Sequence, residues 1–352
     1  MNIAVIGAAG SVGREISRQI IAERMLDKDQ TLQLVGNPKG SSSRYLHGLV
    51  ADFFDAYAEI CPRMEVVLDP EAIRADVIVM AGGSTIPLDL SKPQMERGFL
   101  AERNAPLFHL YASVLAKNGR GSEIVICISN PNELAVAVFA RYLGRKRVIG
   151  MGAYLDSLRF RKEIAADLGV RRQAVHGFMI GEHGDAMVPL WSGIHVHGFS
   201  PEELAKAIEK MRRGCPVERF PEEVKEARGK IMELVHASRF AEAYRRIDKY
   251  PPDIRTALKP FVTHLSGAKT VTGTARATIT FLQTIMMGND ALVSGQLALE
   301  GEFYGIIGTL GVPFVIGNQG VDRIIQLAIA DDEKRLLLRN AGQVQEKLRA
   351  YL

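Results

Sequence analysis

The first 150 residues alternate between short apolar runs and longer amphipathic stretches. The apolar runs are rich in valine and isoleucine, which is typical of buried strands, whereas stretches such as Val12–Arg24 and Glu133–Leu143 repeat apolar residues at helical spacing. We expect five strands, at Asn2–Ile6, Leu32–Val35, Val77–Met80, Ile124–Ile128 and Val148–Gly150. Strands that alternate with helices predict an α/β fold with a Rossmann-type, doubly wound parallel sheet.

The spacing of apolar residues changes after residue 150. Helices are predicted at Leu155–Leu168 and Thr270–Met287, and a charged helical region over 201–259 is expected to be interrupted by Pro251, Pro252 and Pro260. Two strands, a hairpin and a final amphipathic helix are predicted, in this order, at Gln173–Ile180, Trp191–Val196, Phe303–Val315 and Asp331–Leu352. We therefore expect two domains, the α/β domain at 1–150 and an α+β domain at 151–352.

The composition is that of a folded, globular chain. Its 352 residues are 47% hydrophobic and 24% charged, which argues against wholesale disorder. The net charge of +4 is too small to indicate a nucleic-acid partner, and no apolar run approaches the roughly 18 residues that cross a bilayer. Three widely spaced cysteines and the lack of a basic, apolar leader lead us to expect a cytoplasmic protein with no membrane partner.

Three glycines follow the first predicted strand, as Gly7-Ala-Ala-Gly10-Ser-Val-Gly13. In a dinucleotide-binding turn the first glycine permits the tight turn, the second lets the backbone approach the phosphates, and the third lets helix and strand pack closely. The N–H groups at the start of the next helix then meet the anion. An ordinary glycine-rich turn is the alternative, but the position between the first strand and the first helix favours a dinucleotide site.

The end of the second predicted strand bears on the choice of dinucleotide. A carboxylate at this point binds the ribose hydroxyls of NAD and repels the 2′-phosphate of NADP. The chain has no acid here, and Lys39, Arg44 and the hydroxyls of Ser41–Ser43 are suited to hold a phosphate. This favours NADP as the cofactor, while the alternative in which Asn37 binds the ribose of NAD stays open.

Three polar residues of the second domain suggest acid–base chemistry. Asp156 and Arg159 are three residues apart on a predicted helix and so share a face, and His183 follows in the glycine-flanked sequence Gly-Glu-His-Gly-Asp. A histidine held by a buried carboxylate is a proton acceptor, and an arginine grips a planar carboxylate with two parallel hydrogen bonds. Together they are suited to oxidise a 2-hydroxy acid, although a single histidine is more often a core or loop residue.

These motifs occur together, and the chain resembles the malate/lactate dehydrogenase family over nearly its whole length. The resemblance is carried by GAAGSVG at 7–13, SNP at 129–131, LDSLRFR at 155–161, GEHGD at 181–185, VP at 188–189, GVPFVIGNQGV at 311–321 and DDEK at 331–334. It implies an NAD(P)-dependent dehydrogenase that moves a hydride reversibly between a small 2-hydroxy or 2-oxo acid and a nicotinamide. By analogy it also implies a homo-oligomer, a dimer or tetramer.

The resemblance assigns roles to individual residues. His183 is expected to be the general base or acid, Asp156 its partner, Arg159 the ligand of the substrate carboxylate, and Asn130 the group that orients the substrate oxygen. Thr270 is expected to line the substrate pocket. The expected cofactor-binding residues are Gly7, Gly10, Ser11, Val12, Gly13, Asn37, Gly82, Asn104, Ile128 and Asn130.

The family also has a mobile lid that carries an arginine. Arg97 lies seven residues before Asn104, which is the family's spacing, and closure would bring its guanidinium to the developing alkoxide. The substrate-selecting position falls on Ser91, where malate enzymes have arginine and lactate enzymes typically have glutamine. Because Ser91 is neither, the acid is not identified, and a helix-capping box of Ser91 with Gln94 is the alternative.

Two further features stay open. The family's helix over the active site is extended between Arg219 and Lys269, which either reshapes the substrate pocket, makes a subunit contact or elaborates the surface. His195 and His197 alternate on a predicted strand, but with no third ligand we expect no metal site.

Two other functions are considered. An NAD-dependent glycosidase would need a metal site of cysteine and histidine. A dinucleotide-binding sensor without turnover is the alternative function.

Overall fold

The computed structural model describes residues 1–38, 42–85, 97–184 and 186–352, except for the side chain of Arg97. Its first half is a parallel sheet in the order β3-β2-β1-β4-β5-β6, which confirms the Rossmann-type prediction. The strands are β1 (Ile3–Ile6), β2 (Thr31–Val35), β3 (Arg63–Val67), β4 (Val77–Met80), β5 (Ile124–Cys127) and β6 (Val148–Gly150). The order reverses between β1 and β4, so a ligand site is expected at the carboxyl ends of these two strands.

Strand β3 has no counterpart in the sequence-based prediction. Its first four residues alternate between charged and apolar side chains, and only Val67 is buried. Since β3 forms the edge of the sheet, it needs no continuous apolar run, and a search for such runs misses it.

The same sheet continues into the second half of the chain through antiparallel pairs. Strand β6 pairs with β11 at the contact between Gly150 and Gln296, and the sheet then runs through β12, β8 and β9. These strands are β8 (Met179–Gly181), β9 (Met187–Pro189), β11 (Ala291–Glu300), β12 (Ile307–Gly317) and β13 (Gly320–Ile324), which pairs with β12. The second domain is thus α+β, as predicted, and it shares its sheet with the first.

Three strand predictions in this half are wrong in extent. The expected strand Gln173–Ile180 is broken, because a short helix leads into β7 (Val175–His176), which leaves the main sheet and pairs with β10 (His195–Val196). Of the expected strand Trp191–Val196 only β10 is extended, since Trp191 turns into the core and donates a hydrogen bond to Asp253. The hairpin is β11 with β12, so it begins twelve residues earlier than predicted, at Ala291 rather than Phe303.

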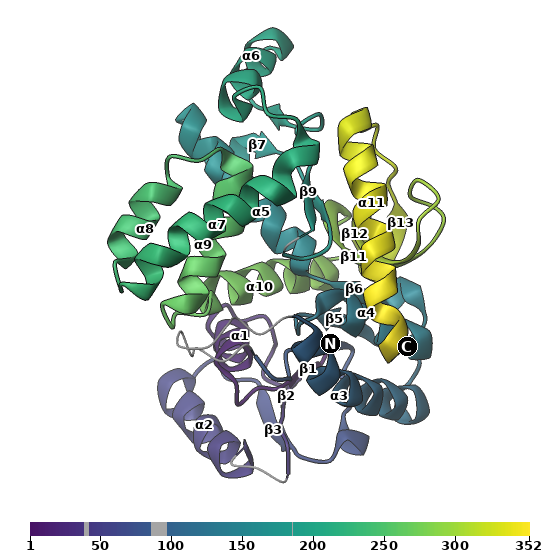
Figure 1. The fold of residues 1–352 in the computed structure, drawn as a ribbon. Helices are drawn as coiled ribbons and strands as arrows, with labels where there is room; N and C mark the ends of the chain where they lie inside the picture. The colour runs from purple at the N-terminus through teal and green to yellow at the C-terminus, as the bar shows by residue number, and fades with distance from the viewer. Residues whose placement is uncertain (39–41, 86–96, 185) are drawn as a thin grey trace.

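Helices cover both faces of the sheet (Figure 1). The α-helices are α1 (Ser11–Ala22), α2 (Ser42–Tyr57), α3 (Arg97–Asn118), α4 (Asn132–Leu143), α5 (Gly152–Leu168), α6 (Pro201–Arg212), α7 (Phe220–His236), α8 (Phe240–Ile247), α9 (Pro252–Leu265), α10 (Val271–Met287) and α11 (Asp331–Leu348). Short 3-10 helices are η1 (Pro70–Ala72), η2 (Arg145–Arg147), η3 (Arg172–Ala174), η4 (Val217–Arg219) and η5 (Arg349–Tyr351).

The prolines of the helical extension confirm the prediction in part, because α8 ends at Ile247 and the predicted break at Pro251 and Pro252 separates it from α9. Pro252 starts α9, a position where a missing backbone N–H costs nothing. Pro260 lies inside α9 and does not end it, so the predicted interruption there is wrong. Packing of α9 against α5 and α7 supplies the stability that the lost hydrogen bond removes.

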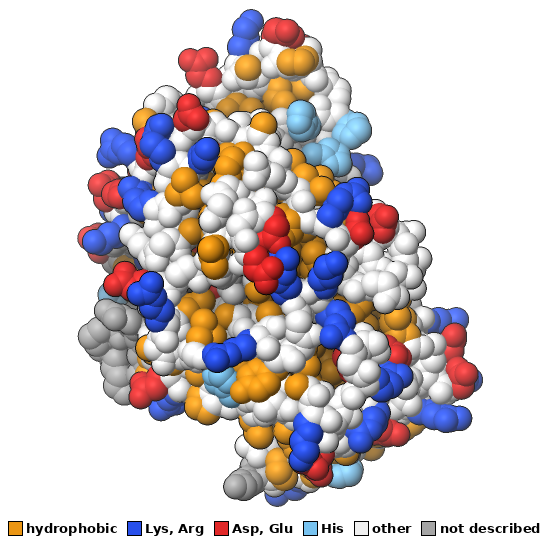
Figure 2. Space-filling model, turned by 90° about the vertical axis from the view of Figure 1, so that its right-hand side faces the viewer, with side chains coloured by type: hydrophobic (Ala, Val, Ile, Leu, Met, Phe, Trp, Pro, Cys, Tyr) orange, Lys and Arg blue, Asp and Glu red, His pale blue; other side chains and the backbone are white. Residues whose placement is uncertain are grey.

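The two halves are also joined by helices. Figure 1 shows α10 lying across the first domain, where it packs on α1, and Arg276 and Gln283 of α10 both bind Glu23. The face drawn in Figure 2 mixes basic and acidic side chains, in keeping with the small net charge. Within the described ranges, no helix combines the length and the apolar character needed to cross a bilayer.

Candidate active site

The glycine turn after β1 is built for close backbone contacts. Gly7 has φ +85°, and a Cβ there would lie 2.6 Å from the Cα of Gly82. A Cβ on Gly13 would lie 2.3 Å from the carbonyl oxygen of Gly7, so this position also excludes a side chain. The turn thereby brings the start of α1 against the ends of β1 and β4, where its unbonded N–H groups are suited to an anion.

His183, Asp156 and Arg159 converge as the sequence predicts. Nδ1 of His183 lies 2.7 Å from Oδ2 of Asp156, and Nη1 of Arg159 donates to Oδ1 of the same carboxylate at 3.1 Å. Asp156 is buried, with a side chain that is 3% exposed, whereas the side chains of His183 and Arg159 are 19% and 20% exposed. The carboxylate therefore anchors two side chains that still reach a solvent-accessible space.

Electrostatics keeps Asp156 charged in this buried place. Burial by itself would raise the pKa of Asp156, but the charges and hydrogen bonds of His183 and Arg159 outweigh it and lower that pKa. Burial lowers the pKa of Arg159, and the charge of Asp156 opposes the effect. A charged Asp156 holds a proton on Nδ1 of His183, which leaves Nε2 as the atom that can exchange a proton with a ligand.

Two residues that sequence reasoning missed support His183. Oε1 of Glu133, on α4, accepts a hydrogen bond from the backbone N–H of His183 at 2.7 Å. Burial raises the pKa of Glu133 to about 7, and the nearby charge of Glu182 adds to the rise. On the other side, a Cβ on Gly152 would lie 2.4 Å from Cγ of His183, so the imidazole packs directly on the first turn of α5.

The loops after β4 and β5 are joined by side chains. The buried amide of Asn104 accepts a hydrogen bond from the N–H of Ser84 and donates to the carbonyl oxygen of Asn130 at 2.7 Å. The hydroxyl of Ser129 donates to the carbonyl oxygens of Met80 and Gly82. Asn104 thus fixes the loop that carries Asn130, a role that spacing alone does not reveal.

A cavity of about 510 Å³ brings these parts together. It is lined from the first domain by Ser11, Val12, Gly82, Ile128 and Asn130, and from the second by Asp156, Arg159, His183, Thr270 and Thr274. Helices α7 and α9 add Arg228, Thr256, Ala257, Pro260, Phe261 and His264, which the sequence did not place here. The extended region therefore forms part of the cavity wall.

Several predicted residues are located only in part. Ser91, Lys39 and Ser41 lie outside the described residues. Arg97 is the first residue of α3, but its side chain lies outside the described part of the structure. Asn37 is exposed at the end of β2, close to the start of α2.

Other titratable groups gather elsewhere. His176 pairs with His195 across β7 and β10, and Nε2 of His176 lies 3.1 Å from Nε2 of His197. The three imidazoles line a separate cavity of about 880 Å³ beneath α6, which contains none of the residues around His183. Over the described part of the chain, no group of three or more His, Cys, Asp or Glu side chains is arranged to hold a metal ion.

Comparisons with known proteins identify the family. The family model of the lactate/malate dehydrogenase NAD binding domain matches residues 1–150, and that of the lactate/malate dehydrogenase alpha/beta C-terminal domain matches residues 153–251. An L-2-hydroxycarboxylate dehydrogenase (NAD(P)(+)) of Methanocaldococcus jannaschii is 28% identical over 99% of this chain and 97% of its own. A malate dehydrogenase of Chlorobium phaeobacteroides is 27% identical over 99% of this chain and 98% of its own.

Solved structures show the same fold. A lactate dehydrogenase of Eimeria maxima with NADH and oxamate matches with a TM-score of 0.74 at 21% identity, covering 99% of this chain and 93% of that one. A malate dehydrogenase of Aeropyrum pernix matches with a TM-score of 0.73 at 24% identity, covering 99% and 98%. Both family models, the shared fold and the convergence of His183, Asp156 and Arg159 lead to one conclusion. The chain belongs to the lactate/malate dehydrogenase family.

Proposed function

We propose that the chain is an NAD(P)-dependent 2-hydroxyacid dehydrogenase that interconverts a small 2-hydroxy acid and its 2-oxo acid. The observation that carries the proposal is that His183, held by Asp156, lines the same cavity as the start of α1 at the glycine turn. A dinucleotide fits this arrangement, because the close backbone contacts at Gly7 and Gly13 hold the start of α1 at the end of β1, where its N–H groups can meet the pyrophosphate.

The chain's own residues account for the proton and for substrate orientation. Nε2 of His183 takes the proton of the substrate hydroxyl, and Asp156 stabilises the imidazolium that results. Arg159 fixes the substrate carboxylate, and Asn130 orients the reacting oxygen. The nicotinamide supplies or accepts the hydride when the dinucleotide is bound.

The lid completes the site in this proposal. Arg97 stabilises the charge on the reacting oxygen, and the lid that precedes α3 excludes water when it closes. The substrate-selecting position is Ser91, which offers no cation for a second carboxylate. We infer that the selectivity of this enzyme depends on the cavity wall formed by α7 and α9 as well as on the lid.

The cofactor assignment is NAD or NADP, and we favour NADP. Arg44 is exposed near the start of α2, and a Cβ on Gly36 would lie 3.1 Å from that of Ser42, so this helix start adjoins the end of β2. A helix N-terminus with a nearby arginine is suited to a 2′-phosphate. The name of the Methanocaldococcus jannaschii relative gives both dinucleotides for that protein. We also propose a homo-oligomer.

The test is a panel of 2-oxo acids reduced with NADH and with NADPH in parallel. Oxaloacetate, pyruvate and bulkier 2-oxo acids are compared by kcat/KM, which reports selectivity. We expect turnover of at least one acid and loss of that turnover in His183→Ala, with dinucleotide binding kept. A protein that binds the dinucleotide but reduces no acid would support the sensor alternative, which the intact set of His183, Asp156 and Arg159 does not favour.

A further inference from the structure

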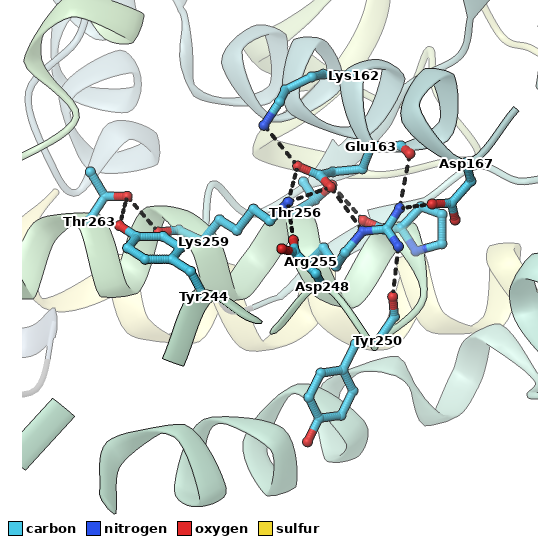
Figure 3. A network of polar contacts seen from close by, with 11 residues as sticks. Lys162, Glu163, Asp167, Tyr244, Asp248, Tyr250, Arg255, Thr256, Lys259 and Thr263 are labelled. Carbon is cyan, nitrogen blue, oxygen red and sulfur yellow. Dashed lines mark hydrogen bonds and ion pairs between the residues drawn. The ribbon is translucent and has the colours of Figure 1, made fainter. Parts of the chain in front are cut away.

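A buried ionic network joins the helix that carries Asp156 and Arg159 to the helix that walls the cavity (Figure 3). Its centre is Glu163 of α5, whose side chain is 4% exposed. Oε2 of Glu163 accepts a hydrogen bond from Nε of Arg255 at 2.9 Å and one from Nζ of Lys259 at 2.8 Å. Both cations belong to α9, so one carboxylate binds side chains from two successive turns of that helix.

The network extends beyond the central carboxylate. Nη2 of Arg255 donates to the carbonyl oxygen of Glu163 at 2.9 Å and to Asp167 at 2.7 Å, and Nη1 donates to the carbonyl oxygen of Tyr250 at 3.0 Å. Nζ of Lys259 also lies 2.9 Å from Asp248. Burial alone would raise the pKa of Glu163, but hydrogen bonds from Lys259 and Lys162 lower it, so the carboxylate is charged.

The positions of these groups along α5 connect them to the chemistry. Asp156, Arg159 and Glu163 are spaced by three and four residues, so they lie along one face of α5. The first part of this face supplies the groups that contact His183 and line the cavity, and the next turn binds α9. A shift of α9 relative to Glu163 is therefore a shift of the cavity wall relative to Arg159.

Helix α9 contacts α5 with one face and lines the cavity with the neighbouring face. Arg255 and Lys259 are four residues apart and point to α5, while Thr256, Ala257, Pro260 and Phe261 line the cavity. Pro260 cannot donate the backbone hydrogen bond that would tie it to the preceding turn. At Pro260, where α9 lines the cavity, the helix therefore lacks one of its own backbone hydrogen bonds. Lys259, the residue before Pro260, is held by its contact with Glu163.

We infer that Glu163 is a positioning residue, which through Arg255 and Lys259 sets the distance between the α9 wall and Arg159 and so sets which 2-oxo acids fit. The inference rests on the proposed function, since it concerns the substrate side of the same cavity. The dinucleotide side is formed by other elements, the glycine turn and the ends of β1 and β4, and the network around Glu163 includes none of their residues.

The test compares Glu163→Gln, which keeps the shape and removes the charge, with Glu163→Asp, which keeps the charge on a shorter side chain. Glu242→Gln is the matched control, because Glu242 forms an exposed ion pair with Arg239 in the same helical extension. For each variant KM and kcat are measured with pyruvate, 2-oxobutyrate and 2-oxohexanoate, together with the dissociation constant of the dinucleotide and the melting temperature.

We expect Glu163→Gln to raise KM for the 2-oxo acids roughly tenfold and to change the ratio of kcat/KM between short and long acids, because even a full misplacement of about 1 Å costs about 100-fold and the wall is expected to shift by less. Dinucleotide affinity stays within about twofold of wild type, and Glu163→Asp recovers part of the loss. The control keeps wild-type kinetics.

A Glu163→Gln protein with a lower melting temperature but wild-type KM values and ratios would overturn the inference and leave only a structural role. An equal loss of dinucleotide affinity would overturn it as well. If Glu163→Gln does not fold, Lys259→Met, which keeps the contact between Glu163 and Arg255, is expected to raise KM by a smaller factor, and unchanged KM values there would also refute the role. A wild-type protein that reduces no 2-oxo acid would instead overturn the proposed function.

Discussion

At the scale of single residues, the site depends on how His183 is held. Asp156 binds Nδ1 of its ring, Glu133 accepts its backbone N–H, and Gly152 leaves the space that the ring occupies. Glu133 and Asp156 are both buried carboxylates, yet their pKa values move in opposite directions. Burial acts to raise the pKa of both, but the charges and hydrogen bonds of His183 and Arg159 outweigh it at Asp156. At Glu133 the charge of Glu182 adds to burial, and the backbone N–H of His183 does not offset the two.

The raised pKa of Glu133 predicts a pH-dependent stability. Its pKa is about 7 in the folded protein, whereas the ordinary value of 4.5 applies to the unfolded chain. The folded protein therefore binds more protons between these values, and stability falls as pH rises through this range. The loss reaches about 3 kcal/mol by pH 8. Glu133→Gln keeps the acceptor for His183 and should lack this loss. Urea unfolding of both proteins at pH 5 and pH 8 measures the difference, and parallel pH profiles would contradict it.

Gly152→Ala tests how closely α5 supports the histidine. The new Cβ would lie 2.4 Å from Cγ of His183, so the ring must move away from Asp156 or from the substrate. We expect kcat/KM to fall by about 100-fold or more, with dinucleotide affinity kept. Gly342→Ala in α11 is the control, because nothing lies within 4 Å of the added methyl group. Equal kinetics in the two variants would show that the ring tolerates the displacement.

At the scale of elements, the loops of the site follow the ends of strands, and the body of α5 supplies Asp156 and Arg159. The glycine turn joins β1 to α1, Asn130 follows β5, and His183 follows β8. Parallel packing brings the first two to one edge of the sheet, and α5 brings Asp156 across to His183. The strands hold the loops in place. A substitution that moves a helix relative to its strand should therefore change the affinity for the dinucleotide.

Gly13→Ala probes the contact between α1 and β1. A Cβ there would lie 2.3 Å from the carbonyl oxygen of Gly7, which cannot move without disturbing β1. We expect the start of α1 to be displaced and the dissociation constant of the dinucleotide to rise at least about tenfold. Gly48→Ala in α2 is the control, since a methyl group there meets nothing within 4 Å. Titration by nucleotide fluorescence measures both, and unchanged affinity in Gly13→Ala would rule out this close contact.

At the scale of the whole molecule, the two domains share one sheet. Strand β6 of the first pairs with β11 of the second, Glu133 of the first accepts a hydrogen bond from the backbone N–H of His183 of the second, and α10 packs on α1. The cavity lies between these shared elements and takes its lining from both halves. The halves should therefore unfold together.

Calorimetry tests this coupling. We expect a single heat absorption peak, with a calorimetric enthalpy close to the van't Hoff enthalpy. Dinucleotide at about 100 times its dissociation constant should shift the whole peak to higher temperature, since binding raises the free energy of unfolding by about 2.7 kcal/mol. Two peaks, of which only one responds to the dinucleotide, would show that the domains unfold independently.

Features that depend on residues close together in the chain can be predicted from the sequence alone. The buried parallel strands, the glycine turn and the shared face of Asp156 and Arg159 can be predicted, because apolar spacing and short motifs express constraints between residues that are close along the chain. The pairing of Asp156 with His183, 27 residues further on, is expected from the family resemblance. Other features arise only from tertiary packing: the edge strand β3, the continuation of α9 through Pro260, the support of His183 by Glu133 and Gly152, and the grip of Glu163 on α9. Each of these features depends on contacts between residues that are distant in sequence. The local spacing of apolar residues does not indicate such contacts.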